Sequence, residues 1–251
     1  MRRRFFVDRF EADSAVLGGE SADHLGRVLR AERGELYELS DGQQVWLAKI
    51  QHVALAKGGR SRIEFSLIEP LPVSRPRMRM DLLLSIVKFD RFEWSLEKAT
   101  ELGATRIVPL AAARTERSLI AAAKNRQRRW KRILLESAQQ SRRLTPPELD
   151  EISTPETAFA QFFAGLKILC SERREAPPLS EVLSPRSAVS AAALAIGPEG
   201  GWTGAEIGAA RSAGFAEASL GENILRTETA ALAALAVLGF ALGSRVDVPR
   251  S

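Results

Sequence analysis

The pattern of apolar positions changes once along the chain, at a proline-rich stretch. Before residue 71 the apolar residues form short alternating runs typical of half-buried strands. Strands are expected at 4–7, 36–40, 45–50 and 62–68. One short helix, capped by Ser21, is expected between the first two strands. Its apolar face would consist of His24, Leu25, Val28 and Leu29. Several short strands with one helix predict a small β-barrel.

Prolines 70, 72 and 76 mark the expected domain boundary, which we place between residues 72 and 73. Beyond it, apolar runs alternate with helical patterns. The run at 80–87 predicts a strand buried on both faces. Further strands are expected at 106–110, 166–170, 192–196 and 216–220, and helices at 92–102, 125–142, from 154 onward, at 203–213 and at 227–242. This alternation predicts an α/β domain with a parallel sheet covered on both faces.

The first helix of this second domain has a clear amphipathic pattern. Its core-facing positions are Phe92, Leu96, Ala99 and Leu102. Its solvent-facing positions are Glu93, Glu97, Lys98 and Glu101. The helix should therefore pack one side against the sheet.

Two glycine-containing turns each follow a predicted strand and precede a predicted helix. They cover residues 196–203 and 220–229. Glycine lets a backbone come close to a ligand, and the pair could therefore wall one small-molecule cleft. The first turn is not a P-loop, because no Lys-Ser or Lys-Thr follows its glycines, and taken alone Gly197 to Gly201 could be only a tight connection between a strand and a helix. The chain also lacks the G-x-G-x-x-G of a dinucleotide site.

Four polar side chains stand in these turns: Glu199, Asn223, Arg226 and Glu228. Arg226 lies where a helix starts, and its charge is unfavourable there against the helix macrodipole. Such a placement indicates a ligand. The alternative is a structural ion pair with Glu228 or Glu199.

Charge is concentrated in one segment. Residues 114–143 carry ten basic and two acidic side chains. Residues 1–72 carry 11 basic and 11 acidic side chains, and residues 144–251 carry eight basic and 13 acidic ones. This local excess is expected of a phosphate-binding surface, although a solvated helix face would also explain it.

Cysteine and histidine counts exclude two kinds of site. The single cysteine excludes an internal disulfide, and with only two histidines the chain does not predict a metal site. No signal-peptide pattern opens the chain, and its longest near-apolar run extends only from Ala230 to Leu242. That length suits a buried helix better than a membrane span, so a cytoplasmic protein without a membrane partner is expected.

Several short motifs occur along the chain, and their combination in a fixed order identifies a family more specifically than any single motif. They are HLGRVLR at 24–30, KFDRFEW at 88–94 with KATELG at 98–103, SAQQSRR at 137–143, GPEGG at 197–201 and LRTETA at 225–230. In this order they resemble the RsmE family of SPOUT-superfamily methyltransferases, which make N3-methyluridine in small-subunit ribosomal RNA. The resemblance runs from Arg4 to the end of the chain.

The resemblance implies a PUA-like β-barrel over residues 1–72 that binds RNA. It implies a SPOUT-type trefoil-knot α/β methyltransferase domain over residues 73–251 that forms a homodimer. The implied cofactor is S-adenosyl-L-methionine, without a metal, and the implied substrate is 16S ribosomal RNA, free or within the 30S subunit. The implied cofactor-binding residues are Leu169, Ile196, Gly197, Pro198, Glu199, Gly200, Gly201, Leu220, Gly221, Ile224, Leu225, Arg226, Thr227 and Ala230.

The expected reaction is transfer of a methyl group to the N3 atom of a uridine. The expected catalytic residues are Arg226, which would stabilise charge on the uracil carbonyls, and Glu228. Either Glu228 or Glu199 would orient Arg226 or accept the proton. The phosphates would be held by the basic segment and by Arg2, Arg3, Arg4, His24, Arg27, Arg30, Arg114, Arg142 and Arg143.

Two positions depart from the family's usual pattern. Asn223 stands where an arginine is usual, and Phe89-Asp90 stands where glycine followed by an acidic residue is common. Two other functions stay open at this point. One is an RNA-binding assembly factor without catalysis, and the other is a methyltransferase acting on another RNA or on a ribose hydroxyl.

Overall fold

The computed structural model describes residues 3–56, 60–73, 75–76, 78–162, 165–183 and 189–242. The chain divides into two compact units. The first comprises Met1–Arg75 with Glu136–Pro146, and the second comprises Pro76–Leu135 with Pro147–Ser251. A short segment from the middle of the chain therefore packs with the N-terminal residues. The functional roles of the two domains, and the boundary at residue 72, stay predictions.

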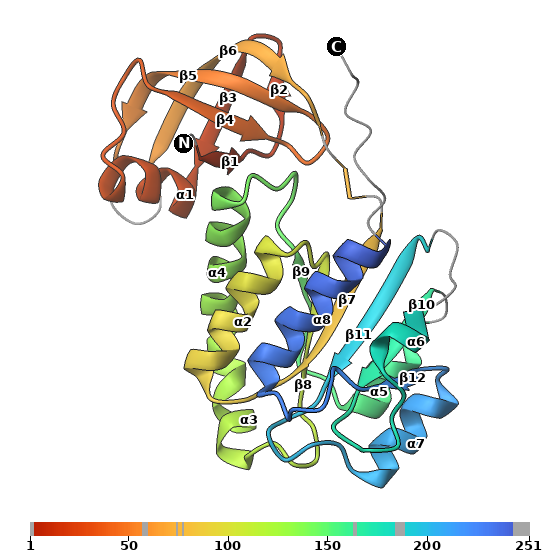
Figure 1. The fold of residues 1–251 in the computed structure, drawn as a ribbon. Helices are drawn as coiled ribbons and strands as arrows, with labels where there is room; N and C mark the ends of the chain where they lie inside the picture. Colours follow the sequence, from red (N-terminus) through yellow and green to blue (C-terminus); the bar gives the residue numbers. More distant parts are fainter. Residues whose placement is uncertain are drawn as a thin grey trace, which may run out of the picture. The chain divides into compact units, whose positions relative to one another are not determined.

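One six-stranded sheet forms the first unit, in the order β1-β4-β5-β6-β3-β2 (Figure 1). Its strands are β1 (Arg4–Phe6), β2 (Phe10–Glu11), β3 (Ser14–Gly18), β4 (Leu36–Ser40), β5 (Val45–Ala54) and β6 (Arg62–Leu71). The four expected strands are present, and β2 and β3 were not expected. The sheet curls into a half-barrel with β1 and β2 at its edges, around a core that includes Phe5, Leu39, Ile50 and Phe65.

The helix of the first unit starts earlier than expected. Helix α1 (Gly19–Asp23) has Gly18 as its N-cap, so the prediction that Ser21 caps it is wrong. It continues into a π-helical turn, His24–Val28. The wider turn departs from the 3.6-residue period on which the apolar face was predicted. Val28 is consequently 63% exposed, while Leu25 is buried.

Hydrogen bonds join the segment Glu136–Pro146 to the sheet of the first unit. The Arg4 guanidinium donates to the carbonyl of Arg142 at 2.6 Å and pairs with Glu38 at 2.9 Å. The Ser40 hydroxyl donates to the carbonyl of Leu144 at 2.8 Å. These contacts explain why the segment belongs with the N-terminal residues.

A parallel six-stranded sheet forms the second unit, in the order β12-β10-β11-β7-β8-β9. Its strands are β7 (Arg79–Ser85), β8 (Arg106–Leu110), β9 (Glu148–Leu149), β10 (Leu166–Cys170), β11 (Ala191–Ile196) and β12 (Ala216–Ala218). The helices that follow β6 in sequence are α2 (Phe89–Glu101), α3 (Arg117–Ala123), α4 (Gln127–Gln140), α5 (Pro155–Ala160), α6 (Leu179–Leu183), α7 (Gly204–Ser212) and α8 (Thr227–Leu242). Strand β9 and helices α3 and α6 were not expected.

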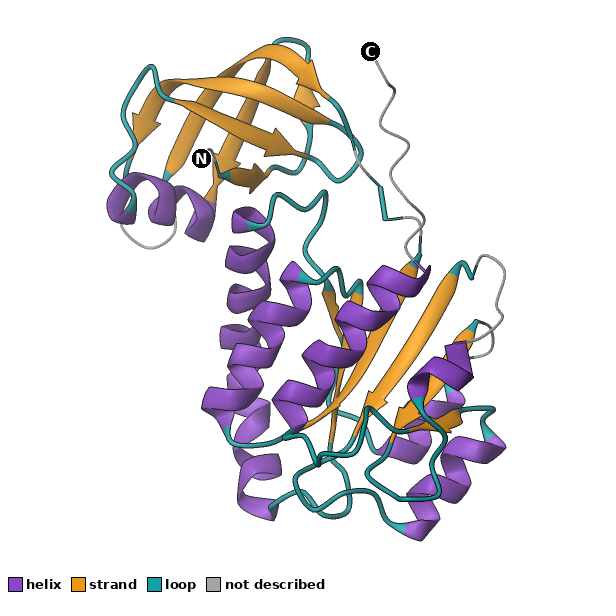
Figure 2. Ribbon diagram, in the orientation of Figure 1, coloured by secondary structure: helices purple, strands orange, loops and turns teal. Residues whose placement is uncertain are grey.

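Helices cover both faces of this sheet, as expected (Figure 2). Leu82 and Leu84 of β7 pack with α2, α4 and α8 on one face, whereas Leu83 packs with α5 and α7 on the other. The prediction of a strand buried on both faces is confirmed, although it ends at Ser85 rather than at residue 87. The knot that the resemblance implies stays a prediction.

The basic segment is not the single helix expected at 125–142. It forms α3, a 3-10 turn at Lys124–Arg126 and α4. The prediction that Glu93 faces solvent is also wrong. Glu93 is 9% exposed and accepts hydrogen bonds from Arg126 at 3.0 Å and Arg129 at 2.7 Å, because the basic segment packs beside α2 and supplies the cations.

Two general properties can be stated for the described part of the chain. No helix there is long and apolar enough to cross a membrane. Nor do three or more His, Cys, Asp or Glu side chains come together there in an arrangement that could hold a metal ion.

Candidate active site

Four neighbouring strands of the second unit end at the same edge of the sheet. The register pairs Cys170 with Ile196 and with Ala218, and it pairs Ile196 with Leu84. Because the carboxyl ends of parallel strands share an edge, the loops that follow β7, β10, β11 and β12 come together there. Strand β10 lies between β11 and β12. The loop after β10 therefore lies between the two glycine turns.

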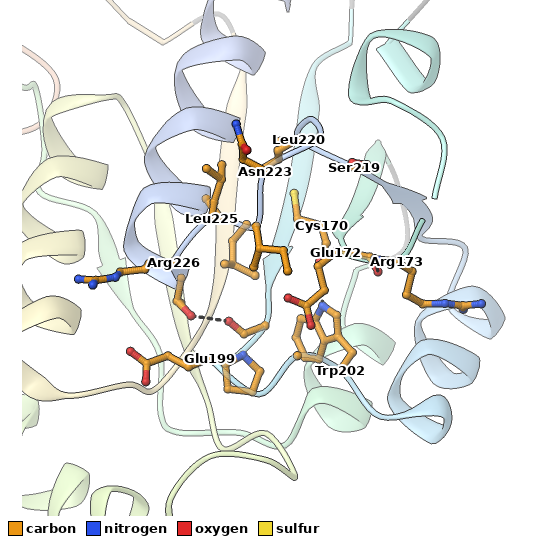
Figure 3. A pocket seen from close by; sticks show the side chains of 18 of the residues that line it. Cys170, Glu172, Arg173, Glu199, Trp202, Ser219, Leu220, Asn223, Leu225 and Arg226 are labelled. Atoms are coloured by element: carbon orange, nitrogen blue, oxygen red, sulfur yellow. Dashed lines mark hydrogen bonds between the residues drawn. The ribbon is translucent and has the colours of Figure 1, made fainter. Parts of the chain in front are cut away.

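These loops enclose a cavity of about 530 Å³ (Figure 3). Its volume is typical of a small-molecule site. Of the expected cofactor-binding residues, those that line it are Ile196, Gly197, Pro198, Glu199, Gly201, Leu220, Gly221, Ile224, Leu225, Arg226, Thr227 and Ala230. The structure thus brings together two turns that a whole helix and a strand separate in the sequence.

Two of the expected cofactor-binding residues do not line the cavity. Leu169 is 1% exposed and packs with α5 and α7 on the far face of the sheet. Side chains alternate between the two faces of a strand, so Leu169 points away while Cys170 lines the cavity. The Leu169 side chain therefore does not line the cavity, and its part in cofactor binding stays a prediction. Gly200 is not part of the wall either, and its carbonyl accepts a hydrogen bond from Arg114 at 2.8 Å.

The backbone of the first glycine turn lies close to its neighbours. A Cβ atom on Gly197 would come within 3.1 Å of the Trp202 indole. Gly201 has a φ of +68°, and a Cβ there would come within 2.7 Å of a Glu172 carboxylate oxygen. The Thr227 hydroxyl donates to the Gly197 carbonyl at 2.9 Å and so joins the two glycine turns (Figure 3). Side chains larger than glycine would disturb this wall.

Trp202 and Arg114 hold the first turn in place. The Trp202 side chain is buried, and its Nε1 donates to the carbonyl of Cys170 at 2.9 Å. The Arg114 guanidinium donates to the carbonyls of Gly200 at 2.8 Å and Trp202 at 3.3 Å. Arg114 was expected to bind RNA, but in the structure its guanidinium supports the cavity wall.

Sequence reasoning missed the third wall of the cavity. It is formed by Cys170, Ser171, Glu172 and Arg173, at the end of β10 and just after it. Figure 3 shows Glu172 and Arg173 on the opposite side from Glu199 and Arg226. The strand itself was predicted, so the residues after its carboxyl end could have been named as candidates for the cavity wall. That β10 lies between β11 and β12 could not have been predicted, because local sequence patterns do not give the order of strands in a sheet.

The carboxylates expected to hold Arg226 contact a different arginine. Arg91, in the first turn of α2, forms ion pairs with Glu199 and, at 3.8 Å, with Glu228. Arg226 is exposed and lines the cavity. The Glu228 side chain is 11% exposed, and within the described ranges its Oε2 atom is buried without a hydrogen-bond partner. Arg91 is a site residue that sequence reasoning missed, although its position at a helix start carries the same electrostatic signal as Arg226.

Most residues expected to bind RNA belong to the first unit. They are Arg3, Arg4, His24, Arg27, Arg30, Arg142 and Arg143, whereas Arg114 belongs to the second unit and Arg2 lies outside the described residues. Arg3, Arg27 and Arg30 are exposed, and Arg27 pairs with Asp23 at 2.9 Å. Arg4 is only 12% exposed and engaged with Glu38, which favours a structural role over contact with phosphate.

The remaining members of this group are partly buried. Burial lowers the pKa of the Arg143 guanidinium to about 10, so it stays charged at neutral pH. Both ring nitrogens of His24 are buried and lack hydrogen-bond partners in the part of the chain that the structure describes. Arg142 adopts a positive φ of 55° at the end of the basic segment and faces Glu38 at 3.5 Å.

Comparison with known proteins gives the family. A family model described as an RNA methyltransferase domain matches residues 74–239. The ribosomal RNA small subunit methyltransferase E of Synechocystis is 37% identical over 232 residues, covering 88% of this chain and 71% of that protein. The chain belongs to the ribosomal RNA small subunit methyltransferase E family. The Bacillus subtilis methyltransferase E is 28% identical, and the match covers 95% of this chain and 96% of that protein.

A solved structure extends the likeness to the whole fold. The crystal structure of a methyltransferase E from Neisseria gonorrhoeae bound to S-adenosyl methionine is 31% identical to this chain, with a TM-score of 0.82. The match covers 96% of this chain and 98% of that one. It confirms the expected family and the fold class, a curled N-terminal sheet followed by a parallel α/β domain.

The thiol of Cys170 is buried although the residue lines the cavity. Burial raises the pKa of its thiol to about 12, so almost none of it is the reactive thiolate at pH 8. We expect the native protein to resist alkylation by iodoacetamide at pH 8. In denaturant the thiol pKa returns to about 8.5 and labelling should be rapid. Mass spectrometry of the intact protein measures both, and equally rapid labelling of the native protein would contradict the prediction.

Proposed function

We propose that this protein transfers a methyl group from S-adenosyl-L-methionine to the N3 atom of a uridine in 16S ribosomal RNA. The observation that carries this proposal is the cavity between two glycine turns, in a chain of the small-subunit methyltransferase E family. A family member from N. gonorrhoeae has been solved with S-adenosyl methionine bound. The cavity has the volume and the close backbone approach that such a ligand needs.

The residues around the cavity fit this cofactor. Backbone groups of the two glycine turns and of the loop after β10 would hold it, with Ile196, Leu220 and Trp202 as apolar contacts. When bound, S-adenosyl-L-methionine supplies a methyl group on a positively charged sulfur, which is a good leaving group. Asn223 also lines the cavity, so the departure from the family's usual arginine falls within the site itself.

We assign Arg226 to the charge that develops on the uracil. Loss of the N3 proton spreads negative charge over the two neighbouring carbonyl oxygens. Arg226 lines the cavity and is exposed, so its long side chain is free to bring the guanidinium to that charge. Glu228 is too deeply buried to touch a base, and we assign it to holding Arg91. The target base must be unpaired or flipped out of its stack for N3 to be reached.

RNA would be held mainly through phosphates. The exposed Arg3, Arg27 and Arg30 of the first unit and the basic residues between 114 and 143 provide the positive charge. Binding of this kind weakens steeply as salt is raised. We propose 16S ribosomal RNA, free or in the 30S subunit, as the partner, and that substrate implies a cytoplasmic location.

Two measurements test the proposed function. Isothermal calorimetry should show binding of S-adenosyl-L-methionine, and an assembly factor without catalysis would show none. Mass spectrometry of ribosomal RNA from cells with and without the protein should show one additional N3-methyluridine. A methyl group found on a ribose hydroxyl, or on another RNA, would instead establish a methyltransferase with a different target.

We also propose a homodimer formed through α2 and α8. Trp94 on α2 is 45% exposed, and on α8 Val237 is 42% and Phe240 is 91% exposed. Helices α2 and α8 pack against each other, and exposed apolar side chains on a pair of packed helices are typical of an interface. The Phe240→Glu variant should therefore run as a monomer in size-exclusion chromatography with light scattering. Ile68→Glu, which alters an exposed apolar residue of the first unit, should stay dimeric. A wild-type protein that is monomeric at micromolar concentration would contradict the proposal.

A further inference from the structure

Three charged side chains from three separate elements meet beside the cavity. Arg91 comes from the start of α2, Glu199 from the first glycine turn and Glu228 from the start of α8. Arg91 and Glu199 line the cavity, and Glu228 lies behind them. Both carboxylates are far from Arg91 in sequence, since β8 to β11 lie between them and α2. The parallel sheet brings them together at its carboxyl edge.

The exposure of the three groups differs in a consistent order. Glu199 is 47% exposed, Arg91 is 27% exposed and Glu228 is 11% exposed. A substrate base that enters the cavity can therefore reach Glu199 but not Glu228. Figure 3 shows Glu199 on the same side of the cavity as Arg226, the residue assigned to the uracil carbonyls. The accessible carboxylate and the charge-stabilising arginine thus both belong to this side of the cavity.

The cluster fixes the place of the accessible carboxylate. Two carboxylates surround a single guanidinium, and only one of them lines the cavity. Glu228 contacts Arg91 from the buried side, and Arg91 holds Glu199 at the cavity wall. The Glu199 carboxylate can therefore accept a hydrogen bond from a base that enters the cavity.

We propose that Glu199 is the catalytic base of methyl transfer and that Arg91 and Glu228 are its positioning residues; this rests on the proposed function. The N3–H bond of the uracil breaks and its proton passes to the Glu199 carboxylate. The electron pair left on N3 forms the new bond to the methyl carbon, whose bond to sulfur breaks with its electrons going to sulfur. Water then takes the proton from Glu199 as product leaves, so that charge and atoms balance.

Replacement of Glu199 by Gln tests the proposal. Single-turnover methyl transfer to 30S subunits or 16S ribosomal RNA, whichever the wild type methylates, should slow by about 100-fold or more. Calorimetric affinity for S-adenosylhomocysteine and the unfolding temperature should stay at wild-type values. Glu199→Asp should retain part of the rate, because it keeps a carboxylate. The matched control is Glu156→Gln, an exposed carboxylate on α5, which should keep the full rate.

The positioning residues are tested by separating the rate from binding. Arg91→Gln removes the guanidinium that contacts both Glu199 and Glu228. The single-turnover rate should fall, while KM for RNA and affinity for S-adenosylhomocysteine stay close to those of the wild type. Arg91→Lys keeps a cation and should recover part of the rate. A merely structural role would lower cofactor affinity and unfolding temperature together with the rate.

The outcomes separate the base from the proposed function. A wild-type protein that binds no S-adenosyl-L-methionine and methylates no RNA overturns the proposed function. A wild type that methylates RNA while Glu199→Gln keeps its rate overturns the assignment of the base and leaves the function standing. Equal losses of cofactor affinity and rate in Glu199→Gln would also overturn it, because Glu199 would then serve to build the cofactor site.

Discussion

Replacement of Arg226 by alanine is expected to slow methyl transfer by about 100- to 1,000-fold. Arg226 lines the cavity at the start of α8, and its side chain is exposed. Its stabilising effect arises only as negative charge develops on the uracil carbonyls. The loss should therefore fall on kcat, while affinity for S-adenosylhomocysteine stays close to that of the wild type.

Steady-state kinetics with ribosomal RNA and calorimetry with S-adenosylhomocysteine measure the two quantities separately. Arg211→Ala is the matched control, since it removes one exposed positive charge from the same unit on α7. It should leave kcat unchanged. A kcat for Arg226→Ala equal to that of the wild type would show that Arg226 has no part in the chemical step. A rise in KM alone would make it an RNA-binding residue.

The second large effect is expected for Trp202→Ala. Its ring is 8% exposed and packs edge-on against Phe159 at a centroid distance of 5.9 Å. The indole also supports Gly197 and bonds the carbonyl of Cys170. Removing a buried tryptophan of this kind costs about 3–5 kcal/mol of unfolding free energy. Because the ring joins the loops after β10 and β11, the Trp202→Ala variant should lose cofactor affinity as well as unfolding free energy.

Urea denaturation and calorimetry with S-adenosylhomocysteine measure both effects. Trp202→Phe is the matched control, because it keeps an aromatic ring and removes the indole N–H. That variant should lose about 1–3 kcal/mol, the range for leaving a buried acceptor unpaired, and retain most of the cofactor affinity. An alanine variant with wild-type stability would contradict the supporting role assigned to this ring.

Local sequence patterns predicted the elements of the second unit well. The apolar run that begins at residue 80 and the two glycine turns at 196–203 and 220–229 are each visible in short windows of sequence. The family resemblance also followed from motif order, and relatives confirm it. The errors have local causes as well. Val28 was misplaced because the π-helical turn alters the helical period.

The partners of charged residues were not predictable in this way. Glu93 was expected in solvent because its own helix gives it a polar position, but arginines from another part of the chain cover it. Either Glu228 or Glu199 was expected to hold Arg226, and both carboxylates instead pair with Arg91 on α2. Short-range patterns describe a residue's own element and carry no information about which element packs against it.

The sequence by itself therefore determined the family, the alternation of strands and helices and the two glycine turns that wall the cavity. The tertiary structure alone decided that β10 lies between β11 and β12, which places a third loop in the site. It also decided that Arg91 joins Glu199 and Glu228. The physical reason is that strand order and cross-chain ion pairs depend on the packing of distant segments, whereas turns, caps and hydrophobic periods depend on neighbours in the chain.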